Sequence, residues 1–265
     1  MPDLSDVLVP PRFCGPPSSG NGGWSAGAIA VRAAEACPDS HSRPWPAVTV
    51  SLQAPPPLDV PLPVTTTDDG GVVATYDGKP VLSARCSHDP VTDVEPVRPD
   101  EAHAAMASFV GLRGHPFPTC FSCGTGRAEG DGLRIFPGRV SDATDVPGEE
   151  PRPRVAATWT PGPSVAGDDP TPDRHPRASV PVTWAALDCV GGWAGDLEER
   201  LMVLARMTAR LDSLPVIGEE HVVVGMGRGR DGRKAWTSST LYDANGRVVG
   251  SAEHLWIAVD PASFA

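Results

Sequence analysis

The alternation of hydrophobic and polar positions predicts a helix followed by extended segments near the start of the chain. From residue 21 onward, apolar side chains recur at three- and four-residue spacing, as in Trp24, Ala28 and Val31, which is typical of a helix with one buried face. Cys37-Pro38 ends this helix, because proline cannot continue it. Runs rich in β-branched residues and bounded by turn residues then predict strands. These predicted strands cover residues 47–53, 60–67, 72–77 and 80–87.

The same order of elements returns towards the end of the chain. Residues 182–197 form an apolar run that predicts a second helix. Proline separates the first two strands of each set, as Pro55-Pro56-Pro57 in one and as Leu214-Pro215 in the other. A repeated series of elements constrains the fold more than any single motif does. The second set of predicted strands covers residues 202–211, 221–227, 234–243 and 247–259, and hairpin turns are predicted at Asp77-Gly78, Asp231-Gly232 and Asn245-Gly246.

The region between the two sets is less regular. Residues 88–118 are rich in acidic residues and proline and predict a linker with one short amphipathic helix over 100–110. Strands are predicted over 133–136 and 155–160 before the second helix. The polar stretches 141–153 and 162–176 predict loops. We therefore divide the chain into an N-terminal unit (1–87), a linker (88–118) and a C-terminal unit (119–265).

A Gly-Gly-Trp motif occurs in both predicted helices. The first copy is Gly22-Gly23-Trp24, preceded by Asn21, and the second is Gly191-Gly192-Trp193. A glycine pair at the start of a buried helix directs unpaired backbone N–H groups at a ligand, and such groups can hold a carbonyl oxygen. Alternatively, Asn21 caps its own helix and the glycines only allow close packing.

Composition narrows the function classes. The 265 residues carry a net charge of −11, which argues against nucleic acid as the main partner. No apolar run approaches the length of a membrane span, and the acidic start Met1-Pro2-Asp3 does not resemble a secretory signal. We therefore expect a cytoplasmic protein without a membrane partner, with its six cysteines reduced.

Two of the cysteines have the spacing of half a zinc knuckle, Cys120-Phe121-Ser122-Cys123-Gly124. His115 and Cys14 are conceivable further ligands, but the chain has no second Cys-x-x-Cys. A tight turn that carries two packed thiols is the simpler interpretation. We expect no bound metal and no cofactor, and zinc stays an open alternative.

These features resemble hotdog-fold acyl-CoA thioesterases of the duplicated type. The resemblance covers nearly the whole chain outside the linker. It rests on a helix followed by a long antiparallel sheet, which occurs twice in the chain. It also rests on Asn21-Gly22-Gly23, which stands where several branches of the family have His-Gly-Gly. It implies an α+β fold of two tandem hotdog units whose sheets join, with the active site between the helices. It also implies an acyl-CoA or acyl carrier protein thioester as substrate. Further pairing into a homodimer is common in this fold.

The resemblance also suggests site residues. The duplicated branch carries an aspartate near the start of its second helix, where this chain has Asp188. The carboxylate of the first helix has no counterpart, because Val31 and Arg32 stand there. For the Gln in the last strand of that branch, this chain offers Glu253 or His254, which point to opposite faces of a strand.

Asp188 fits catalysis on its own chemistry as well. It lies among Ala185, Ala186, Leu187 and Val190, and a carboxylate in apolar surroundings has a raised pKa suited to a general base. Its simpler role is a helix cap. Cys189 is most simply a small buried residue.

Two further groups are candidates for substrate binding. Trp24 and Trp193 can line an acyl pocket or belong to the core. A basic cluster can hold coenzyme A phosphates or form a solvated hairpin tip; it consists of Arg228, Arg230, Arg233 and Lys234.

These observations favour an acyl-thioester hydrolase in which Asp188 activates water and Gly22 and Gly23, with Asn21, polarise the carbonyl. A hydratase or dehydratase acting on an enoyl thioester is an alternative if His254 faces the cleft beside Asp188. A non-catalytic acyl-CoA-binding module is the third.

Overall fold

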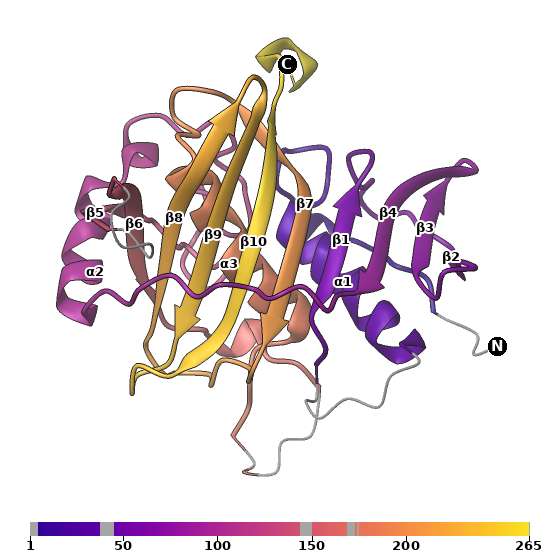
Figure 1. Ribbon diagram of the computed structural model, residues 1–265, viewed down its shortest axis with the longest axis horizontal. Coiled ribbons are helices and arrows are strands. Elements are labelled where there is room, and N and C mark those ends of the chain that lie inside the picture. Colours follow the sequence, from indigo (N-terminus) through magenta and orange to yellow (C-terminus); the bar gives the residue numbers. More distant parts are fainter. Residues whose placement is uncertain (1–4, 38–44, 144–149, 169–172, 174, 265) are drawn as a thin grey trace.

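The computed structural model describes residues 5–37, 45–143, 150–168, 173 and 175–264. Its described strands form one antiparallel sheet in the order β2-β3-β4-β1-β7-β10-β9-β8-β6-β5 (Figure 1). The helices are α1 (Gly22–Ala36), α2 (Pro99–Ala105) and α3 (Val180–Ala194). The strands are β1 (Val48–Leu52), β2 (Val64–Thr66), β3 (Val72–Tyr76), β4 (Lys79–Cys86), β5 (Gly138–Ala143), β6 (Arg152–Trp159), β7 (Met202–Leu211), β8 (His221–Asp231), β9 (Lys234–Tyr242) and β10 (Val248–Ala258).

The predicted internal repeat is visible in the strand order. After α1 the sheet runs β1-β4-β3-β2, and after α3 it runs β7-β10-β9-β8, so each helix is followed by the same pattern of pairing. The two series meet where β1 pairs with β7, with Val50 opposite Met207. Each half therefore contains the same series of a helix, a strand, a proline corner and a hairpin. The strands of the two halves join edge to edge in the single sheet.

Helices α1 and α3 pack against each other on one face of the sheet (Figure 1). Glycine allows this close crossing. A Cβ at Gly23 would lie 2.3 Å from Asp188 Cβ, and a Cβ at Gly27 would lie 2.6 Å from the Pro181 Cα. The packing interpretation of Gly23 is thus confirmed, with a helix rather than the sheet as its neighbour.

Segment 88–98, within the predicted linker, runs across the opposite face of the sheet to reach α2 (Figure 1). Val94 and Val97 are buried in a hydrophobic cluster with Val224 and Met226 of β8. The Val94 N–H donates to Thr240 Oγ1 at 2.8 Å. This segment therefore covers apolar sheet surface that would otherwise face water.

Several local predictions were wrong in detail. Residues 133–136 form no strand, although the Leu133 and Ile135 N–H groups donate to the carbonyls of Phe121 and Ser122. Arg134 between them has a φ of 53°, which interrupts an extended backbone. Strand β5 begins at Gly138 and extends into the predicted loop 141–153. The prediction missed this strand because it lies at the edge of the sheet, where polar side chains give it the sequence pattern of a loop. Of the predicted strand 60–67, only Val64–Thr66 forms a strand, and Leu62 makes an isolated bridge to Val7. Pro61 and Pro63 on either side of Leu62 lack the N–H groups that a continuous ladder requires.

The cysteines also depart from expectation. Cys37, which follows α1, forms a disulfide with Cys86 at the end of β4, with Cα atoms 6.3 Å apart. The expectation that all six cysteines are reduced is therefore wrong for this pair, because the fold brings two residues 49 apart in sequence into contact. None of the helices that the structure describes has the length and apolarity to span a membrane.

Candidate active site

Asp188 lies in the middle of α3 and is buried, with 2% of its surface exposed. Its carboxylate does not cap its own helix. Instead, Oδ2 accepts a hydrogen bond from the Gly23 N–H at 2.8 Å and a second from Asn21 Nδ2 at 3.3 Å. The carboxylate therefore sits at the positive end of α1, where a negative charge is stabilised. Burial nevertheless raises the pKa of Asp188 to about 7.

Asn21 caps α1 and links it to α3. As the N-cap of α1, its Oδ1 accepts from the Trp24 N–H at 2.8 Å, so the capping interpretation is confirmed. Its Nδ2 donates to Asp188 and also lies 3.6 Å from Cys120 Sγ and 3.7 Å from Cys189 Sγ. An amide has one acceptor and two donor hydrogens, and all are used here.

The N–H groups of Gly22 and Gly23 differ in their hydrogen bonding. The Gly23 N–H is engaged by Asp188, so the expectation that both glycines polarise a carbonyl is corrected for Gly23. Among the described residues, no partner of the Gly22 N–H is found. Asp188 Oδ1 is likewise buried without a hydrogen-bond partner in the described part of the chain. One backbone donor and one carboxylate oxygen are thus available to a ligand.

Both residues line a cavity of about 370 Å³. Its wall combines the start of α1 and the Pro55-Pro56 corner with β7 residues such as Leu204, and Trp256 of β10. The cavity therefore lies where the two repeated series meet. Most of the wall is apolar, and its buried polar residues include Asp188, Asn21 and Ser19.

A cluster of sulfur atoms lies beside Asp188. The Sγ atoms of Cys120, Cys123 and Cys189 are within 4.8 Å of one another, and all three residues line the cavity with His115. Hydrogen bonds from the Cys123 and Cys189 thiols hold the pKa of Cys120 well below its usual range. The sequence indicated Cys120, Cys123 and His115 but not Cys189, whose signal was only its place next to Asp188.

Other predicted site residues lie elsewhere. Glu253 is exposed on the outer face, where its Oε1 accepts from the Thr92 N–H at 3.4 Å. His254 is buried on the inner face, 3.3 Å from Thr237 Oγ1. The prediction that they face opposite ways is thus confirmed. Neither lines the Asp188 cavity, within the part of the chain that the structure describes.

The second Gly-Gly-Trp motif is not equivalent to the first. Gly22-Gly23 opens α1, whereas Gly191-Gly192 lies in the last turn of α3. A Cβ at Gly191 would lie 2.7 Å from His254 Nδ1, so this glycine permits close helix–sheet packing. Trp193 packs edge-on against His115 at 5.3 Å between ring centroids.

Trp24, Trp193 and the basic cluster do not line this cavity. Trp24 stacks on Phe13 at 4.3 Å between ring centroids, and both Trp24 and Trp193 are buried in the core. Arg228 and Arg230 line a different cavity of about 460 Å³. Arg230 is paired there with Asp196. Arg233 lies in the β8–β9 turn, and Lys234 begins β9.

His254 gives a prediction for the pH dependence of folding. Burial lowers its pKa from 6.5 to about 4, so between these values the unfolded chain binds a proton at His254 and the folded chain does not. The contribution of neutral His254 to the free energy of unfolding is therefore constant above pH 6.5 and is lost as the pH falls towards 4. The total loss in the free energy of unfolding is about 3 kcal/mol. Urea unfolding of wild type and His254→Gln across this range should show a shallower acid loss in the variant. The same exchange at exposed His88 is the control; parallel curves for wild type and His254→Gln would contradict the prediction.

The comparisons with known proteins agree with the architecture. No family model and no curated protein matches the sequence. Among solved structures, the tesB protein of Mycobacterium avium subsp. paratuberculosis is similar, with a TM-score of 0.55 at 15% identity over 96% of this chain and 92% of that one. A protein with a hot dog fold from Alicyclobacillus acidocaldarius has a TM-score of 0.57 at 14% identity over 98% and 96% of the two chains.

A third similar structure is described as a candidate thioesterase from Novosphingobium aromaticivorans, with a TM-score of 0.55 at 14% identity. It covers 98% of this chain and 100% of its own. Matches over nearly the whole length confirm the predicted double hotdog fold. The fold and the site together define a double hotdog protein with one buried carboxylate in the cavity where its halves meet.

Proposed function

We propose that this protein hydrolyses acyl thioesters at the Asp188 cavity. The observation that carries the proposal is the arrangement of the carboxylate: one oxygen is fixed by the Gly23 N–H and the other is buried and unpaired within the described residues. A carboxylate so oriented can hold and activate a water molecule. Units 1–87 and 119–265, joined by 88–118, would each contribute one wall.

The roles follow from the geometry. Asp188 Oδ1 accepts a proton from water as the water oxygen forms a bond to the thioester carbon. The Gly22 N–H, at the positive end of α1, donates to the oxyanion that develops. When the carbon–sulfur bond breaks, the proton on Asp188 passes to the departing thiolate, leaving a carboxylic acid and a thiol.

The cavity suits an acyl chain more than a polar substrate. Leu204, Met202 and Ile257 contribute apolar surface, and burial of hydrocarbon there favours binding. The similar structure from Novosphingobium aromaticivorans is described as a candidate thioesterase, which supports this substrate class. We propose coenzyme A as the carrier of the acyl group, with acyl carrier protein as the alternative carrier.

Hydrolysis of acyl-CoA esters of graded chain length tests the proposal. We expect loss of the thioester ultraviolet absorbance with release of free acid, and a clear preference among chain lengths. The same acyl groups on acyl carrier protein provide the second arm. Folded protein without turnover on either carrier would contradict the proposal and favour a binding module. A product that retains the thioester after addition of water to an enoyl ester would indicate a hydratase.

A further inference from the structure

We propose that Cys120, Cys123 and Cys189 form a zinc site beside the Asp188 cavity. The three residues come from two distant parts of the chain: Cys120 and Cys123 from the loop before β5, and Cys189 from α3. Such a site replaces the expectation that the protein binds no metal. It does not depend on the proposed hydrolysis, because it rests only on the sulfur geometry and its surroundings.

The distances fit a tetrahedral ion. Zinc–thiolate bonds of about 2.3 Å place the sulfur atoms of a tetrahedral site about 3.8 Å apart. Cys120 Sγ and Cys189 Sγ are 3.6 Å apart, and Cys123 Sγ lies within 4.8 Å of both. Small side-chain rotations therefore suffice to bring all three sulfurs to one ion.

The polar groups around the sulfurs suit thiolates. Asn21 Nδ2 is directed at Cys120 and Cys189, and His115 Nε2 lies 3.3 Å from Cys123 Sγ. A neutral thiol is a weak acceptor, whereas a metal-bound thiolate carries charge that these donors stabilise.

The loop that carries Cys120 and Cys123 is built as a tight turn. The Gly124 N–H donates to the Cys120 carbonyl at 2.8 Å. A Cβ at Gly124 would lie 2.4 Å from that oxygen, so a larger residue would open the turn. The glycine after the second cysteine therefore keeps both thiols on one side of the loop.

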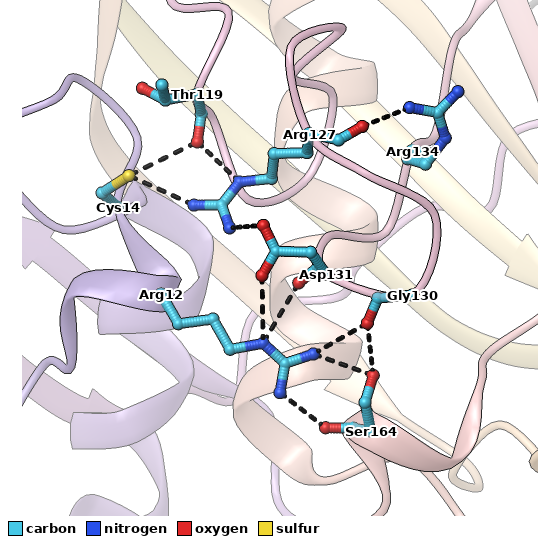
Figure 2. Close-up of polar contacts among 8 residues, drawn as sticks. All are labelled: Arg12, Cys14, Thr119, Arg127, Gly130, Asp131, Arg134 and Ser164. Carbon is cyan, nitrogen blue, oxygen red and sulfur yellow. Dashed lines mark hydrogen bonds and ion pairs between the residues drawn. The ribbon is translucent and has the colours of Figure 1, made fainter.

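An arginine network holds this loop in place (Figure 2). Arg127 donates to the Thr119 carbonyl at 2.7 Å and pairs with Asp131 at 2.9 Å. Arg12 links the same loop to the N-terminal segment through the Gly130 and Asp131 carbonyls. The loop is thus positioned by contacts that do not involve the sulfur cluster.

The same network excludes Cys14 from the site. Its Sγ donates to the Thr119 carbonyl at 3.3 Å and accepts from Arg127 at 3.2 Å (Figure 2). Of the two further ligands considered from the sequence, Cys14 is therefore replaced by Cys189.

His115 acts as a donor rather than a fourth ligand. Its Nδ1 accepts from the Phe117 N–H at 3.0 Å, so in the neutral ring Nε2 carries the proton and donates to Cys123 Sγ. All three cysteines line the cavity, and the fourth ligand is accordingly a water molecule from the cavity side. Thiolates favour zinc over magnesium or calcium, and binding releases the thiol protons.

Metal analysis of the purified chain tests the site. After expression with added zinc, we expect about one zinc ion per chain in wild type and in Cys14→Ser, and loss of zinc in Cys120→Ser and Cys189→Ser. Cobalt substitution of wild type should give the visible bands of a tetrahedral site and a thiolate charge-transfer band, which needs no variant to fold. Wild-type protein that takes up neither metal after reduction, or zinc content unchanged in Cys189→Ser, would overturn the proposal.

His115→Gln tests the fourth position. A donor to a metal-bound thiolate contributes about 10- to 100-fold in affinity, so the variant should keep the tetrahedral cobalt spectrum with weaker binding. Collapse of that spectrum in a folded variant would make His115 a ligand and overturn the water assignment. Neither measurement uses a thioester, so failure here is distinct from failure of the proposed hydrolysis.

Discussion

Asp188→Asn should lower kcat/KM for thioester hydrolysis by about 10³-fold, within the range that a general base contributes. The amide can still accept the Gly23 hydrogen bond through its oxygen, so the α1–α3 contact is retained. It cannot accept a proton from water at the position of Oδ1. Steady-state kinetics on the preferred acyl-CoA, together with the thermal unfolding midpoint, measures both effects.

The control for this exchange is Asp142→Asn on β5, where the side chain is exposed. This variant should hydrolyse the substrate at the wild-type rate. Loss of activity in Asp188→Asn with an unchanged unfolding midpoint would support a chemical role. A folded Asp188→Asn protein with wild-type kcat/KM would remove Asp188 from the mechanism.

Gly23→Ala should destabilise the fold by about 3 kcal/mol, at the upper end of overpacking effects. The added methyl group would lie 2.3 Å from Asp188 Cβ and 2.8 Å from the Trp184 carbonyl oxygen. Neither is the end of a flexible side chain, so α1 and α3 must move apart. That movement also lengthens the Gly23–Asp188 hydrogen bond. Urea unfolding measures the loss in free energy.

The comparison for Gly23→Ala is Gly162→Ala. Gly162 has extended backbone with φ −87°, and a Cβ there meets nothing within 4 Å. Its stability should stay within about 0.5 kcal/mol of wild type. Equal stability of Gly23→Ala and wild type would show that the two helices cross with more space than the structure gives them.

The sequence by itself determined the repeated order of helix, strand, proline corner and hairpin, because periodicity and turn chemistry are local properties. It also made Asp188 a candidate site residue, since a carboxylate within an apolar helix is conspicuous without any contact map. It missed β5, whose exposed, polar side chains conceal a strand at the edge of the sheet.

Tertiary structure decided which atoms meet. Asp188 caps α1 rather than its own helix because α1 and α3 cross at Gly23, 165 residues away. Cys189 meets Cys120 because the loop that carries Cys120 packs against α3, where Ser122 Oγ donates to the Ala185 carbonyl. The second Gly-Gly pair is a packing feature because it lies at the opposite end of its helix. Local patterns fix which face of a helix is buried, but the partner on that face depends on the crossing of two elements, which no local pattern records.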